Sequence, residues 1–104
     1  MLKIVWRFNL AEGIDEATFF DWLKSYVWAS SARYGCETRA FRLSKGPHAY
    51  STEATWPSEA ARQAWVASEA FKSIPAYPGT GSPWGAQVDM EAVEYHPIDS
   101  YETK

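Results

Sequence analysis

The feature of this chain that most constrains its fold is an internal repeat of two helix-like segments. Glu16 opens an apolar segment that contains Trp22, and Glu59 opens a second segment that contains Trp65 at the same offset. An alternating, strand-like run precedes each segment, and another run follows each segment after a break. Two copies of strand–helix–strand predict a four-stranded sheet with two helices on one face.

The residue pattern places the elements of both repeats. Residues 2–9 alternate with period two and are rich in strand formers, which is typical of a β-strand. The same criteria predict strands at 37–43, 48–56 and 88–95, and helices at 15–34 and 58–73. The resulting order, βαββαβ, is an α+β, ferredoxin-like plan with an antiparallel sheet.

Helices on one face leave the other face of the sheet open. Alternation puts Trp6 and Phe8 together on one face of the first strand, and Phe41 with Leu43 on one face of the second. One of these pairs should lie on the open face, and large apolar side chains there favour burial against a second copy. We therefore expect a homodimer.

Composition limits the class of protein. At 104 residues the chain is expected to form a single domain over 1–104. The net charge of −3 and scattered basic residues argue against a nucleic-acid surface, and no apolar run suits a membrane span or a signal peptide. The single Cys36 cannot form an internal disulfide, which favours the cytoplasm.

Aromatic residues make up 16% of the chain, including six tryptophans, so some of them should line a cavity or a subunit interface. The irregular stretch after residue 73 contains Tyr77 and Trp84, and these side chains favour an ordered loop that covers part of the fold.

Few residues indicate a reaction. His48, His96 and Cys36 are not spaced as metal ligands, so no metal site is expected. Arg7 could pair with Asp89 or Glu91 on a neighbouring strand, or it could project into the helix-side cavity beside Asn9 and hold a substrate carboxylate or phenolate. Trp22 and Trp65 could serve packing or ligand binding.

The segment from Trp65 through Ser68 to Phe71, together with the βαββαβ plan and the length, resembles the dimeric α/β-barrel superfamily and most of all its antibiotic-biosynthesis-monooxygenase-like branch. The resemblance implies an oxidoreductase that works without a cofactor on an aromatic or polyphenolic substrate bound between sheet and helices. Alternatives within the superfamily are a cyclase or isomerase using the same pocket, and a non-catalytic dimeric module for binding or stress response.

The resemblance also implies roles for individual residues. In the haem-degrading branch an asparagine and a tryptophan line the pocket, and Asn9 and Trp65 stand at matching places, but Pro75 stands where that branch has its iron-ligating histidine. Haem degradation is therefore not expected. The expected catalytic residues are Asn9 and Arg7 as donors to a substrate anion and, for the cyclase or isomerase alternative, Tyr50 or His48 as the acid–base group. The expected substrate-binding walls are Trp22, Tyr26, Trp65, Phe71 and Trp84.

Overall fold

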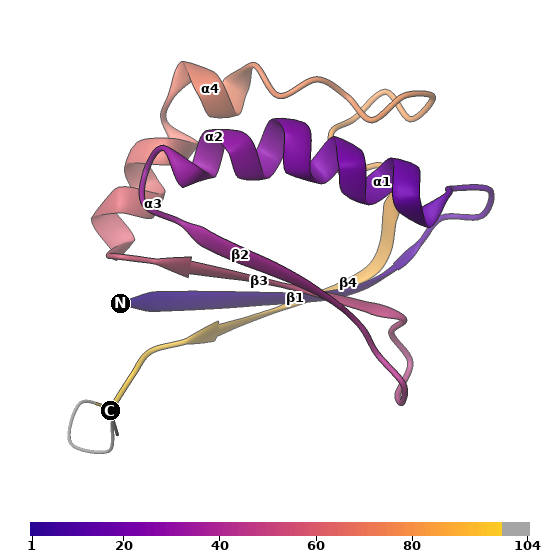
Figure 1. Ribbon diagram of the computed structural model, residues 1–104, viewed down its shortest axis with the longest axis horizontal. Helices are drawn as coiled ribbons and strands as arrows, with labels where there is room; N and C mark the ends of the chain where they lie inside the picture. Colours follow the sequence, from indigo (N-terminus) through magenta and orange to yellow (C-terminus); the bar gives the residue numbers. More distant parts are fainter. Residues whose placement is uncertain (99–104) are drawn as a thin grey trace.

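The computed structural model describes residues 1–98 as an antiparallel sheet with helices on one face (Figure 1). The strands are β1 (Leu2–Leu10), β2 (Glu37–Arg42), β3 (Tyr50–Trp56) and β4 (Gln87–Tyr95). The helices are α1 (Glu16–Trp22), η1 (Leu23–Trp28), α2 (Ala29–Ala32), α3 (Glu59–Val66) and α4 (Glu69–Lys72). The strand order is β2-β3-β1-β4, so the predicted ferredoxin-like α+β plan is confirmed.

The first helical layer is one continuous rod made of α1, η1 and α2 (Figure 1). It begins at Asp15, whose carboxylate accepts hydrogen bonds from the backbone N–H and the hydroxyl of Thr18, each at 2.9 Å. These bonds favour the ionised form and hold the pKa of Asp15 below its usual range. The expected start of this helix is therefore correct.

The middle of the rod is a π-helix rather than an α-helix. Beyond Leu23–Trp28, the backbone N–H of Ala29 reaches the carbonyl of Lys24, five residues earlier. A π segment holds an extra residue and so changes which side chains after it face the sheet. The predicted uninterrupted α-helix over 15–34 is corrected here, because apolar periodicity does not distinguish these two hydrogen-bond patterns.

The second predicted helix, 58–73, is divided into α3 and α4. The division lies at Ser68, whose side chain accepts the backbone N–H of Phe71 at 3.2 Å and donates to the carbonyl of Trp65. Ser68 thereby ends one helix and caps the next. The two short helices place Trp65 and Phe71 side by side, with ring centroids 4.7 Å apart.

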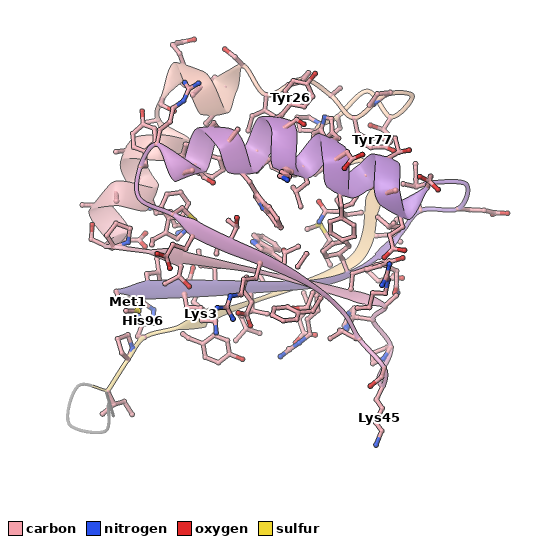
Figure 2. The ribbon with its side chains drawn as sticks, viewed as in Figure 1. Met1, Lys3, Tyr26, Lys45, Tyr77 and His96 are labelled. Atoms are coloured by element: carbon pink, nitrogen blue, oxygen red, sulfur yellow. The ribbon has the colours of Figure 1, made fainter. Side chains whose placement is uncertain are left out.

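The two faces of the sheet have different surroundings. Leu2, Ile4 and Phe8 of β1 point toward the helices and are buried in the core. The opposite face carries ion pairs from Lys3 to Glu53 at 3.2 Å and from Arg7 to Glu91 at 3.7 Å, and Figure 2 shows Lys3 on the side away from the helices.

Two pairs of apolar residues were candidates for the open face, and the pair that lies there is Phe41 with Leu43. Phe8 is fully buried under the helices. Phe41 pairs with Ser51 in the sheet and lies with Leu43 and Tyr95 along a shallow recess on the open face. Phe41 and Tyr95 are each more than 40% exposed there.

The loop from residue 73 to 86 runs over the side of the long helix that faces away from the sheet (Figure 1). Its Tyr77 is buried against Trp22, with ring centroids 5.6 Å apart. A β-carbon on Gly85 would approach the Thr80 side chain to 2.6 Å, so only glycine fits this close approach. The long helix is thus packed between the sheet and this loop, which explains why its apolar residues occupy more than one stripe.

Candidate functional site

A cavity of about 480 Å³ lies between the helix-covered face of the sheet and the helices. This volume is within the range of pockets that hold small organic molecules. Its walls are predominantly aromatic and come from β1, η1, β3, α3, α4 and the 73–86 loop: Trp6, Trp28, Trp56, Trp65, Phe71 and Trp84. Such walls suit a flat ligand, because planar rings can stack on or meet the indole edges.

Trp65 is held in this wall by a hydrogen bond and by contacts with two neighbouring rings. Its Nε1 donates to Ser30 Oγ at 3.0 Å, and Ser30 Oγ in turn donates to the carbonyl of Val27 at 2.9 Å. Its ring meets Phe71 edge-on and lies 5.3 Å from the ring of Trp56. The indole is therefore fixed in place before any ligand arrives.

The cavity opens to solvent between α3, β4 and the 73–86 loop. Trp6, Val66, Trp84 and Met90 all line it, yet each is 36–40% exposed. Arg62 of α3 also lines it and reaches Glu94 of β4, with 3.8 Å between Arg62 Nη1 and Glu94 Oε1. We refer to Trp6, Val66, Trp84, Met90 and Arg62 as the mouth of the cavity.

The polar groups in the wall are mostly uncharged. Ser31, Thr38, Thr52 and Gln87 contribute hydroxyl and amide groups. In the described part of the chain, Gln87 Oε1 is buried and accepts no hydrogen bond. A buried acceptor without a partner costs about 1–3 kcal/mol, so the Gln87 amide is the wall group with the most to gain from a polar ligand atom.

The lining residues include one guanidinium group, that of Arg62, and one carboxylate, that of Glu53. Glu53 is engaged with Lys3 on the opposite face of the sheet. No histidine, tyrosine or aspartate is among the described lining residues. The wall can bind, orient and desolvate a ligand, but it presents no obvious general base.

Cys36 also lines the cavity and is buried. Burial, which disfavours the thiolate, raises its pKa to about 11. The neighbouring Glu37 carboxylate acts in the same direction, whereas hydrogen bonding with Ser31 opposes it. Cys36 is therefore a protonated, weakly nucleophilic thiol at neutral pH.

This raised pKa predicts a loss of stability in alkali. The unfolded chain ionises its thiol at about pH 8.5, while the folded chain keeps the proton until about pH 11. The folded state is thus favoured below the unfolded pKa and loses this advantage as the pH rises toward the folded one. In urea unfolding, the free energy of unfolding should fall more steeply between about pH 8.5 and 11 for the parent than for Cys36→Ala. Equal pH dependence of the free energy of unfolding in the parent and in Cys36→Ala would contradict the raised pKa of Cys36.

The structure brings three of the predicted binding residues, Trp65, Phe71 and Trp84, into one cavity. The expectation that Asn9 shares this cavity with Trp65 is wrong. The Asn9 amide donates to the Pro47 carbonyl at 3.1 Å and to Asp89 at 3.2 Å, and its Oδ1 accepts the Ala49 N–H at 2.7 Å. Asn9 ties the β2–β3 turn to the first strand.

The other predicted catalytic residues also lie elsewhere. Arg7 pairs with Glu91 on the open face of the sheet, and His48 Nδ1 lies 4.0 Å from the same carboxylate. Tyr50 faces the helices but packs between Phe8 and Phe20, at centroid distances of 5.9 and 5.5 Å. None of the three lines the cavity.

Trp22 and Tyr26 do not line the cavity either. Trp22 is buried beneath the 73–86 loop, near Tyr77 and Trp84. Tyr26 is about half exposed on the outer side of the long helix (Figure 2). Both residues face the loop rather than the sheet.

Sequence reasoning missed several cavity residues: Trp6, Trp28, Trp56, Thr52, Arg62 and Gln87. A signal for three of them was present. Trp6 alternates with Ile4 and Phe8, and its partner in the register is Thr52, while Trp56 pairs with Leu2. Once the helix-covered face is known, this alternation assigns all three to the cavity side.

The lining residues do not fit a histidine-ligated haem. Neither histidine lines the cavity: His48 lies beside Glu91 on the open face, and His96 follows β4 and is exposed. Across residues 1–98, no group of three or more histidine, cysteine, aspartate or glutamate side chains could hold a metal ion.

No protein-family model matches the sequence, and no curated protein is similar to it. Solved structures do match. At3g17210 from Arabidopsis thaliana is 13% identical with a TM-score of 0.73, covering 94% of this chain and 96% of that one. SnoaB, a cofactor-independent oxygenase from Streptomyces nogalater solved as a mutant, is 18% identical with a TM-score of 0.70, covering 98% and 94%.

An antibiotic biosynthesis monooxygenase is 18% identical with a TM-score of 0.55, covering 94% of this chain and 99% of that chain. At these identities the similarity establishes the fold. The chain has the ferredoxin-like fold that these proteins share. Among residues 1–98, no helix is long and apolar enough to cross a membrane.

Proposed function

We propose that this protein binds a planar, polycyclic aromatic molecule in the cavity between sheet and helices and promotes its oxidation by O₂. The observation that carries the proposal is the cavity wall, in which six aromatic side chains surround a volume of about 480 Å³. Five of the six are tryptophans, which offer large flat surfaces at small entropic cost.

The reaction class is supported by the likeness to SnoaB, a cofactor-independent oxygenase. In such a reaction a ring CH₂ group and O₂ yield a ring ketone and water, so the four electrons that reduce O₂ come from the substrate. The protein's part is to hold the ligand in one orientation and to exclude bulk water. Because the wall presents no obvious base, the substrate would bind uncharged; a proton lost from the ring CH₂ group during the reaction would pass to water at the mouth and be recovered in the product water.

Binding without chemistry is the second candidate function. The same lack of an acid–base group among the described lining residues favours it. The two candidates share the ligand class and differ in whether O₂ is consumed.

The test uses anthrone as a planar probe and a variant that fills the cavity. Ala54 lines the cavity, so Ala54→Leu should occupy part of its volume and weaken binding about tenfold or more, whereas Ala60→Leu on the exposed side of α3 should not. Binding is measured by the rise in melting temperature, and turnover by O₂ uptake with formation of anthraquinone. Turnover that Ala54→Leu abolishes supports the oxygenase; binding without O₂ uptake supports the second candidate; no binding by the parent contradicts both.

We further propose that two copies pair through the open face of the sheet. Phe41, Leu43 and Tyr95 form an apolar border on this face, and the ion pairs Lys3–Glu53 and Arg7–Glu91 neutralise charges within it. Pairing about a two-fold axis would cover the same patch on both copies. The cavity lies on the other side of the sheet, so each copy would keep its own mouth.

A further inference from the structure

Resting on the proposed function, we infer that the cavity selects ligands in their uncharged form, and that Glu94 sets this selectivity. The inference concerns the ion cluster at the mouth, formed by Arg62, Glu59 and Glu94. It defines the substrate class as a neutral planar polycycle, including a phenol that keeps its proton when bound.

The position of Glu94 follows from the sheet register. Glu94 stands opposite Ile4 in the β1–β4 pairing, and Ile4 lines the cavity. The Glu94 side chain therefore projects from the helix-covered face at the outer edge of the sheet, where it meets Arg62 from α3 at 3.8 Å. The pair spans the mouth between a strand and a helix.

Arg62 is already matched by two carboxylates. Besides Glu94, its Nη1 lies 3.2 Å from Glu59 Oε1, one helical turn earlier in α3. His96 Nε2 also lies 3.6 Å from Glu94 Oε2. With this imidazole neutral, one positive charge faces two negative charges and the cluster has a net charge of −1. A carboxylate ligand that reached this guanidinium would have to displace Glu94 or remain beside it as a third negative charge.

The rest of the wall offers an anion no alternative partner. Among the described lining residues Arg62 is the one cationic side chain, and apart from Glu53 the other lining residues are aromatic, aliphatic or neutral polar. An ionised group buried without a partner is costly, whereas a neutral hydroxyl can bond to the Gln87 amide or the Thr52 hydroxyl. Binding should therefore favour the protonated form of an acidic ligand and raise its pKa.

The experiment compares two fluorescent planar probes, hydroxypyrene and pyrenecarboxylate, by titration against the intact protein at neutral pH. The parent should bind hydroxypyrene about tenfold or more tightly than pyrenecarboxylate, and the phenol pKa of bound hydroxypyrene should rise by about one unit or more, since one unit corresponds to tenfold. Glu94→Gln frees one side of Arg62 and should tighten pyrenecarboxylate binding about fivefold, while hydroxypyrene affinity stays unchanged.

The matched control is Glu69→Gln, which makes the same change in net charge at an exposed position of α4. Equal gains in pyrenecarboxylate affinity for Glu69→Gln and Glu94→Gln would overturn the role of Glu94. Equal binding of both probes by the parent, or a lowered pKa of bound hydroxypyrene, would overturn charge selection while leaving the aromatic site intact. Failure of the parent to bind either probe would overturn the proposed function itself. Because Glu94 is about half exposed, the variant should fold, and its melting temperature checks this.

Discussion

Trp65→Ala should lower the free energy of unfolding by about 3–5 kcal/mol, the range for removing a large buried aromatic side chain. Trp65 is buried, bonds to Ser30, and contacts the rings of Trp56 and Phe71. Losing the indole would leave the Phe71 ring without its edge-on partner and enlarge the cavity. Chemical unfolding measured by tryptophan fluorescence or circular dichroism gives the value.

The conservative variant Trp65→Phe separates stability from binding. It keeps a ring in the wall and loses the hydrogen bond to Ser30, so its stability should fall by only about 1 kcal/mol. The free energy of binding a planar ligand should weaken by more than this loss of stability, because the smaller ring changes the shape of the cavity wall. Trp22→Phe is the matched control, since Trp22 holds the equivalent place in the repeat, is similarly buried, and does not line the cavity. A ligand affinity that depends equally on both residues would argue against Trp65 as a binding residue.

Phe41→Lys should convert a dimer of this protein into monomers. Two-fold symmetry places both copies of the substituted residue in one interface, and burying an unpaired ammonium there is costly. The dissociation constant should rise about 100-fold or more, which corresponds to about 2.7 kcal/mol. Sedimentation equilibrium at micromolar concentration should give twice the mass of one chain for the parent and one chain mass for the variant.

The control for this experiment is Tyr26→Lys. Tyr26 is an exposed aromatic residue of similar accessibility, on the outer side of the long helix (Figure 2). The same substitution there should leave the dimer intact. A monomeric parent, or a Phe41→Lys protein that still sediments as a dimer, would refute pairing through the open face.

The fold could be predicted from the sequence because its signals are local and repeated. Alternation assigned Leu2, Ile4, Trp6 and Phe8 to one face of β1, and the structure confirms that Leu2, Ile4 and Phe8 share the helix-covered core. Asp15 and Ser58 cap helices at the first residues of the predicted ranges 15–34 and 58–73. These features follow from apolar residues that recur every two or 3.6 positions and from capping residues, and both can be read from the sequence.

The site was less predictable because it depends on long-range geometry. Asn9 belongs to the face of Lys3 and Arg7 by alternation, and the register shift between Arg7 and Asn9 lets Asp89 bond to its amide. Resemblance alone placed Asn9 in the pocket. Arg62 and Gln87 carry no motif; they come from α3 and from the start of β4, which are distant in the sequence and are brought to one cavity only by the folded chain.

The π-helical segment Leu23–Trp28 bears on how proteins with this fold can diverge. Deleting one residue within it would restore an α-helix, and the lost residue would offset the tighter winding, so the helix beyond the segment would keep its orientation toward the sheet. Ser31, which follows the segment and lines the cavity, and Phe19 and Trp22, which precede it, would keep their places, and the rearrangement would be confined to the segment itself, which contains the lining residues Leu23, Val27 and Trp28. A change of one codon in length could thus alter one part of the cavity wall while the rest of the helix stays in register, so chain length in this helix is a variable through which evolution can exchange one ligand for another.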